Sequence, residues 1–117
     1  MNFTYAGIRD LATAFQKSRC LLSAYELGVF TALGYKAKTS GEVAKIIKTA
    51  VKSTDRLMNA LCVLGLLQKK NGKFSNTASA SRFLVKGRPE YISSLMHTVN
   101  QWETWSTLTK AVRRGKS

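Results

Sequence analysis

Side chains able to transfer groups or bind metal are few and scattered in this sequence. His97 is the only histidine, and Cys20 and Cys62 lack the paired spacing of a zinc or redox motif. The six acidic residues are dispersed, so no pair of carboxylates suggests general acid and base catalysis. The sequence therefore predicts no catalytic residue and no metal ligand in this chain, and a stand-alone enzyme is the least favoured class.

Basic side chains are the more abundant chemical feature. Nineteen Lys and Arg against six Asp and Glu give a formal net charge of +13 and a pI near 10.2, which would attract polyanions such as nucleic acid. The charges are spread along the chain, however, and a basic surface that serves solubility gives the same count. Charge alone leaves these two interpretations comparable.

The first element that must position any site is helical. Apolar residues recur at helical spacing across residues 6–27, which predicts one long or one broken helix. Gly28 should break this helix, and a short apolar turn then ends at Gly34. A long amphipathic helix at the start of the chain suits contact with a partner.

A helix-turn-helix follows. Thr39 and Glu42 have the spacing of a capping box, which begins a helix that should end near Lys48. Thr49 is expected to cap the next helix, which should close at Gly65. One side of that helix is apolar, and the other side carries Lys52, Arg56 and Asn59. Nucleic-acid readers and pure interaction domains both use this geometry, so function does not follow from it.

A hairpin completes the pattern of a winged helix. Asn71-Gly72 is the dipeptide best suited to a type I′ turn, and residues that favour strands flank it. Thr77 should then cap a short helix through Leu84. The fold class predicted is mainly α: a winged helix-turn-helix with a small β-hairpin wing, with additional N-terminal and C-terminal helices for dimerisation.

The sequence predicts two more helices in the C-terminal part, between Pro89 and about Arg114. The first is expected to hold Tyr91, Ile92, Leu95 and Met96, and the second Trp102, Trp105, Leu108 and Val112. The basic residues 113–117 are typical of the start of a linker.

Size and composition indicate one soluble globular domain. At 117 residues and 44% hydrophobic content, the chain can bury a modest core, and its apolar runs are too short to cross a bilayer. The first ten residues have no secretion signal, so we expect a cytoplasmic protein with no membrane partner.

Several segments in this order resemble the N-terminal dimerisation domain of the S-adenosylmethionine-dependent O-methyltransferases, a family with plant, bacterial and acetylserotonin members. The resemblance covers roughly residues 11–117. The similar segments are YELGVFTAL at 25–33, TSGEVAKII at 39–47, RLMNALCVLGLL at 56–67, KFSNTASASRFL at 73–84 and WSTLTKAVRRGKS at 105–117.

The resemblance implies a role in a larger enzyme. It implies dimerisation helices at 1–34, a winged-helix core at 35–85, and C-terminal helices at 86–117 leading to a linker. It also implies a homodimer that lends residues to the pocket of a small-molecule methyl acceptor. The cofactor S-adenosylmethionine would bind in a following domain, because the eight glycines here form no G-x-G-x-x-G cluster and no cofactor is expected in this chain.

Substrate contacts are also carried over from the family, onto the segment before WSTL. The candidates there are His97, Asn100, Gln101 and Trp102. The alternative is that Trp102 and Trp105 are packing residues and that Asn100 is a cap between the last two helices.

The alternative function is that of a small winged-helix DNA-binding regulator. In that case Lys52, Arg56 and Asn59 would face the major groove, while Lys69, Lys70 and Lys73 on the wing would hold phosphates. Two departures from the family pattern favour this alternative: Ala50 replaces an acidic cap, and Val51 replaces the usual proline.

Overall fold

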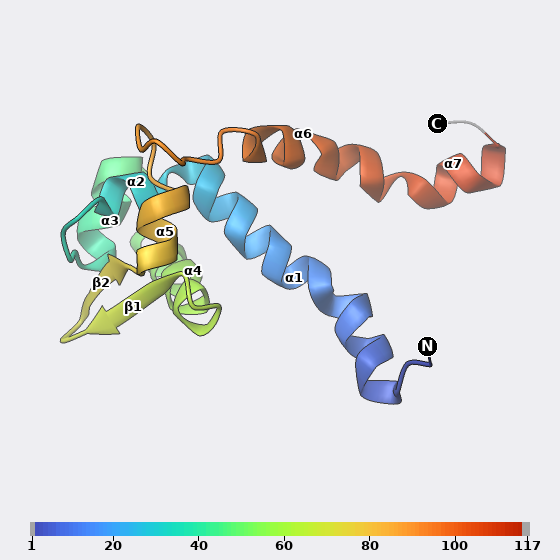
Figure 1. Cartoon of the computed structure of the whole chain (residues 1–117), viewed down its shortest axis with the longest axis horizontal. Helices are drawn as coiled ribbons and strands as arrows, with labels where there is room; N and C mark the ends of the chain where they lie inside the picture. Colours follow the sequence, from blue (N-terminus) through green and yellow to red (C-terminus); the bar gives the residue numbers. More distant parts are fainter. Residues whose placement is uncertain (1, 116–117) are drawn as a thin grey trace.

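The computed structural model describes residues 2–115, which fold into helices and one hairpin (Figure 1). The elements in chain order are α1 (Tyr5–Leu27), α2 (Val29–Leu33), α3 (Ser40–Ile47), α4 (Val51–Val63), β1 (Leu67–Lys70), β2 (Lys73–Asn76), α5 (Ala78–Phe83), α6 (Leu95–Ser106) and α7 (Leu108–Arg114).

Helix α1 forms as one unbroken helix over the span that periodicity predicts. The Thr4 hydroxyl accepts a hydrogen bond from the Gly7 amide at its start, at 3.0 Å. Gly28 ends it with φ of 86°, in the left-handed region that glycine adopts without steric cost. The predicted break at Gly28 is confirmed, and α2 begins directly after it.

Helices α3 and α4 form the helix-turn-helix. The predicted capping box is present: the Thr39 hydroxyl accepts from the Glu42 amide at 3.2 Å, and the Glu42 carboxylate accepts from the Thr39 amide at 2.9 Å. The prediction that Thr49 caps α4 is wrong, because Ala50 occupies that position. The Thr49 hydroxyl lies 2.6 Å from the hydroxyl of Thr54 instead, and Thr54 in turn donates to the Ala50 carbonyl.

Strands β1 and β2 form the wing that the sequence predicts. They pair antiparallel, with Leu67 opposite Asn76 and Lys70 opposite Lys73. Asn71 and Gly72, with φ of 53° and 76°, make the two-residue turn. Lys38 forms an isolated bridge with Phe74, which ties the loop before α3 to the wing. The mainly α winged-helix class is therefore confirmed.

One hydrophobic core joins these elements. It draws on the end of α1, on α2, α3, α4, both strands and α5. Its most deeply buried large side chains are Phe30, Phe74, Leu33, Met58, Leu61, Val29 and Val43. The buried residues of α1 all lie in its second half, and the first half of the helix projects away from the core in Figure 1.

Two predicted details after the wing differ from the structure. Thr77 precedes α5 as expected, but its hydroxyl donates to the Gly65 and Leu66 carbonyls, so it ties the start of α5 to the loop between α4 and β1. The break between the last two helices falls at Thr107, so Trp102 and Trp105 lie in α6.

Three residues near α6 also lie elsewhere than the sequence predicts. Tyr91 and Ile92 precede the helix, and Asn100 lies inside it, so the alternative of Asn100 as a cap is wrong. Among the residues described, no helix is long and apolar enough to cross a membrane.

Candidate functional site

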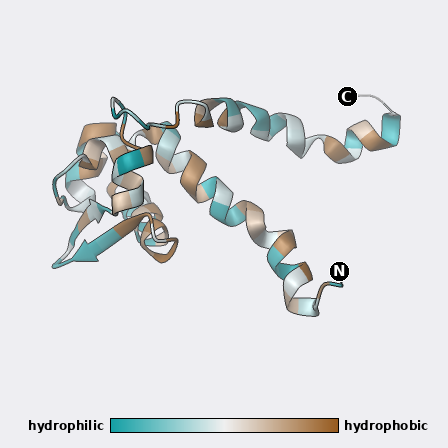
Figure 2. Cartoon of the chain, in the orientation of Figure 1, coloured by the Kyte–Doolittle hydropathy of each residue, from teal (hydrophilic) through white to brown (hydrophobic). Residues whose placement is uncertain are grey.

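Helices α1 and α6–α7 extend from the core as two diverging arms (Figure 1). Residues 5–18 of α1 form the first arm, and α6 with α7 forms the second. Both arms expose large apolar side chains: Tyr5, Ile8, Leu11 and Phe15 on the first, and Trp105, Leu108 and Val112 on the second. Figure 2 shows hydrophobic segments along both arms, far from the core.

These exposed fractions are large for apolar residues. Leu11 is 64% exposed, Trp105 66% and Val112 73%. Single exposed apolar residues are normal on a protein surface, but several on each of two facing helices indicate an interaction surface.

A shallow apolar pocket lies between the two arms. It has a volume of about 310 Å³ and is lined by Phe15 from α1 and by Trp102, Trp105 and Ser106 from α6. Two indole side chains and a phenyl side chain therefore line one pocket. Aromatic side chains in such pockets are the usual anchors of protein–protein contacts.

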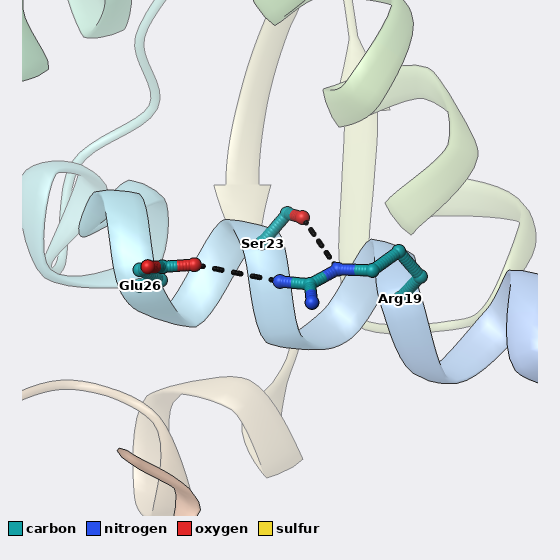
Figure 3. Close-up of polar contacts among 3 residues, drawn as sticks. All are labelled: Arg19, Ser23 and Glu26. Atoms are coloured by element: carbon teal, nitrogen blue, oxygen red, sulfur yellow. Dashed lines mark hydrogen bonds and ion pairs between the residues drawn. The ribbon is translucent and has the colours of Figure 1, made fainter. Parts of the chain in front are cut away.

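Arg19 joins the two arms at their base. Its Nε donates to the Ser23 hydroxyl at 3.0 Å, and its Nη2 lies 3.4 Å from a carboxylate oxygen of Glu26 (Figure 3). The same guanidinium lies 4.9 Å from the ring centre of Trp102, within the range of a cation–π contact. Ser23 and Glu26 fix the guanidinium along α1, so that it can pack against the Trp102 ring on α6.

Sequence analysis did not identify this contact, although a signal existed. Arg19, Ser23 and Glu26 are spaced four and three residues apart, which places them on one side of a helix. The partner ring is distant in sequence, so its position came from the structure alone.

A second, more polar pocket surrounds the same arginine. It has a volume of about 410 Å³ and is lined by Arg19, Glu26, Val99, Asn100, Trp102 and Glu103. Two of the four predicted substrate residues, Asn100 and Trp102, thus border one pocket. His97 and Gln101 lie on α6 with exposed side chains and do not line it.

Tyr25 anchors the segment that leads into α6. Its ring stacks on Tyr91 with 5.7 Å between centroids, and its hydroxyl donates to the Ile92 carbonyl at 3.0 Å. Burial, together with hydrogen bonding and charge from Tyr91, raises the pKa of Tyr25 to about 12. The stacking on Tyr91 and the hydrogen bond to Ile92, residues 66 and 67 positions beyond Tyr25, thus hold the segment that leads into the second arm.

The residues proposed for DNA contact lie on α4 and on the wing. Lys52 and Arg56 are exposed, but the Asn59 amide donates to the backbone and carboxylate of Asp55 and accepts from Lys69. Lys69 also lies over the Phe74 ring at 4.8 Å. Lys70 and Lys73 are exposed beside the hairpin turn. Asn59 is thus occupied within the fold, which leaves it poorly placed to read bases.

The structure also bears on metal and redox chemistry. Within residues 2–115, no three His, Cys, Asp or Glu side chains lie together in a way that could hold a metal ion. Cys20 and Cys62 are free thiols, both half-buried. Burial raises the pKa of the Cys62 thiol, and Lys69 lowers it by a smaller amount.

Sequence relatives of this chain are methyltransferases. It is 33% identical over 108 residues to 3-hydroxy-5-methyl-1-naphthoate 3-O-methyltransferase of Streptomyces sahachiroi, covering 91% of this chain and 31% of that protein. It is 31% identical to the N,N-dimethyltransferase OxyT of Streptomyces rimosus, covering 95% of this chain and 33% of that protein.

Solved structures agree with these relatives. The chain is 28% identical to human N-acetylserotonin methyltransferase in complex with SAM, with a TM-score of 0.81 over 98% of this chain and 36% of that protein. It spans about a third of the length of the relatives that it matches. Because these relatives are methyltransferases, the DNA-binding alternative is not favoured.

A family model supports the same assignment over most of the core. The model of the O-methyltransferase dimerisation domain matches residues 9–86, which include the helix-turn-helix, the wing and most of α1. The chain therefore belongs to the O-methyltransferase dimerisation domain family.

Proposed function

We propose that this chain is the dimerisation and substrate-lid part of a homodimeric, S-adenosylmethionine-dependent methyltransferase. The observation that carries the proposal is the exposure of apolar side chains along both arms, with Phe15, Trp102 and Trp105 around one pocket. Their burial in a second copy would stabilise the dimer by about 25 cal/mol per Å² of apolar area removed from water.

The cofactor and the methyl acceptor belong to the longer protein in this proposal. The human relative is in complex with SAM, and no G-x-G-x-x-G cluster occurs in these 117 residues. We therefore place cofactor binding outside this chain. The relatives include an O-methyltransferase that acts on a hydroxynaphthoate and an N,N-dimethyltransferase, so we propose a small aromatic acceptor that is methylated at oxygen or nitrogen.

The α6 surface is the proposed lid over that acceptor. Asn100 and Trp102 border the polar pocket, and His97 and Gln101 lie on the same helix with side chains open to solvent. In this proposal an amide and an indole contact the acceptor ring, with the other two residues at the edge of the lid. In this proposal residues 1–34 and 86–117 supply the dimer contacts, and 35–85 form the winged-helix core, to which Val29, Phe30 and Leu33 of α2 also contribute buried side chains. The proposed compartment is the cytoplasm.

The lid proposal can be tested by nuclear magnetic resonance with a hydroxynaphthoate as the probe. Titration should shift the Trp102 indole signal and the Asn100 side-chain amide signals. Trp102→Leu should remove the effect on Asn100. Shifts confined to residues away from α6, or none at millimolar probe, would contradict the lid assignment.

The dimer proposal can be tested by measuring the mass of the chain in solution. Sedimentation equilibrium should give twice the mass of one chain, 12.9 kDa, at micromolar concentration. Leu11→Asp with Phe15→Asp should give single chains, because both side chains are exposed in one copy and would be buried only in the pair. Ile46→Asp with Val51→Asp, at apolar residues 52% and 55% exposed outside the arms, is the matched control and should leave the dimer intact. A monomeric wild-type chain would contradict the proposal.

A further inference from the structure

The outer side of α4 carries a stripe that the arms do not explain. Lys52, Arg56, Asn59 and Val63 follow one another at spacings of four, three and four residues, which places them along one side of the helix. The buried residues of α4 are Thr54, Met58 and Leu61, so the stripe lies opposite the core. At 1.5 Å per residue, it is roughly 16 Å long.

Neighbouring elements add positive charge to this stripe. Lys69 of β1 donates to the Asn59 side chain at 3.2 Å, and Lys17 of α1 lies near the other end, beside Val63. The acidic residue of α4, Asp55, is half-buried, and its carboxylate accepts from Asn59 at 3.1 Å. We call Lys17, Lys52, Arg56, Asn59, Val63 and Lys69 together the α4 face.

An apolar pocket lies at the end of the α4 face. It has a volume of about 290 Å³ and is lined by Gln16, Lys17, Cys20, Ala60, Val63 and Leu64. Val63 belongs to both features and is 88% exposed, so its side chain is open to a partner at the edge of this pocket. The face thus combines cations along about three helical turns with a site that could hold one apolar side chain.

We propose that the α4 face binds an acidic amphipathic helix of a second protein. Carboxylates of that helix would pair with Lys17, Lys52 and Arg56, while one of its apolar side chains would enter the pocket beside Val63. Charge complementarity selects this occupant, because the α4 face carries four basic side chains, Lys17, Lys52, Arg56 and Lys69, so two copies of it would repel each other. The interaction goes beyond the proposed dimer: Gln16 and Lys17 lie on the first arm, whereas Lys52, Arg56 and Val63 of α4 and Lys69 of β1 lie outside both arms.

Apolar contact also distinguishes this occupant from nucleic acid. A phosphate backbone attracts cations, but it offers no counterpart to Val63 and the pocket beside it. A DNA-binding helix would use the Asn59 amide to contact a base, but this amide is hydrogen-bonded to Asp55 and Lys69. The mixture of apolar and basic groups therefore matches a protein helix better than a duplex.

The test compares two labelled acidic peptides by fluorescence anisotropy, with the whole chain as receptor. The first is a helical peptide of about five turns with glutamates and one row of leucines. The second has the same length and charge but serines in place of the leucines. At physiological salt the leucine peptide should bind at least tenfold more tightly. Lys52→Glu with Arg56→Glu should weaken it by about tenfold or more, and Val63→Ser should remove most of the preference for leucine.

A control variant and two further measurements keep the test decisive. Lys36→Glu with Lys86→Glu makes the same change in charge at exposed lysines outside the α4 face and should leave the affinity within about twofold. Equal binding of both peptides would overturn the proposal. So would tighter binding of duplex DNA that is insensitive to Val63→Ser. A halved mass of the Lys52→Glu, Arg56→Glu variant would assign the face to a second copy and would also overturn it.

Discussion

At the residue scale, Tyr25 shows how one side chain holds an arm in place. Its hydroxyl donates to the Ile92 carbonyl, and its ring stacks on Tyr91, so one residue of α1 fixes the segment before α6. Tyr25→Phe keeps the stacking and removes the hydroxyl. We expect the free energy of unfolding to fall by about 1 kcal/mol, the usual net contribution of one hydrogen bond. Urea denaturation measures it, and Tyr35→Phe, at a residue 81% exposed, should change it little.

The raised pKa of Tyr25 adds a pH dependence. The neutral phenol is favoured in the folded chain, where the pKa is about 12, over the unfolded chain, where it is near 10. Stability from this residue is therefore complete below about pH 10 and falls as the pH rises towards 12. The advantage of wild type over Tyr25→Phe in unfolding free energy should shrink as the pH rises above 10 and reverse in sign before pH 12, because a pKa shift from 10 to about 12 outweighs about 1 kcal/mol. A constant difference would contradict the assigned pKa.

Thr39 makes a local contribution of a different kind. The Glu42 carboxylate accepts from the Thr39 backbone and lies near Lys73 and Lys38, and the hydrogen bonds at Thr39 are the larger cause of its lowered pKa. Thr39→Ala should lower the free energy of unfolding by about 1 kcal/mol, because the Glu42 amide loses its cap. Thermal unfolding measures the change. Ser40→Ala, one position later, should have a much smaller effect, and equal losses would argue against the capping role.

At the element scale, the wing depends on the backbone of its turn. Gly72 has φ of 76°, and nothing lies within 4 Å of the place where a Cβ would stand. A Gly72→Ala change should therefore cost about 1 kcal/mol through backbone strain alone. Gly41→Ala, inside α3 with a comfortable 3.8 Å to the Thr39 hydroxyl, is the matched control and should raise stability slightly. Denaturation curves of the two variants should thus move in opposite directions.

Local patterns predicted most of these elements. The capping box at Thr39, the break at Gly28 and the Asn71-Gly72 turn each involve residues a few positions apart, and all three are confirmed. The boundary between α6 and α7 was predicted wrongly, because Thr107 ends α6 without a glycine or a proline. Its hydroxyl donates to the Thr104 carbonyl, a local alternative to helical hydrogen bonding that composition does not reveal.

The candidate site was less predictable than the elements. The resemblance to a family suggested the α6 residues, and the structure places Asn100 and Trp102 at one pocket. The guanidinium of Arg19 on the Trp102 ring joins two residues that are 83 positions apart in the chain. No periodicity encodes such a contact, since it depends on how the arms leave the core.

At the scale of the whole molecule, the arms make the chain elongated. Its extents are 49 × 31 × 30 Å, and the core occupies one end of the long axis in Figure 1. The exposed apolar residues of the arms lie outside that core. A single copy therefore leaves much of its apolar surface in water, and association should supply part of the stability of the fold.

This argument predicts a melting temperature that depends on concentration. If the arms are ordered chiefly by a second copy, mass action stabilises the folded pair as the protein concentration rises. The Tm of the wild-type chain should increase over a hundredfold range of concentration, whereas the Tm of the Leu11→Asp, Phe15→Asp variant should stay constant and lower. Differential scanning calorimetry measures both. A wild-type Tm independent of concentration would show that the core at one end of the molecule supports the arms without a partner.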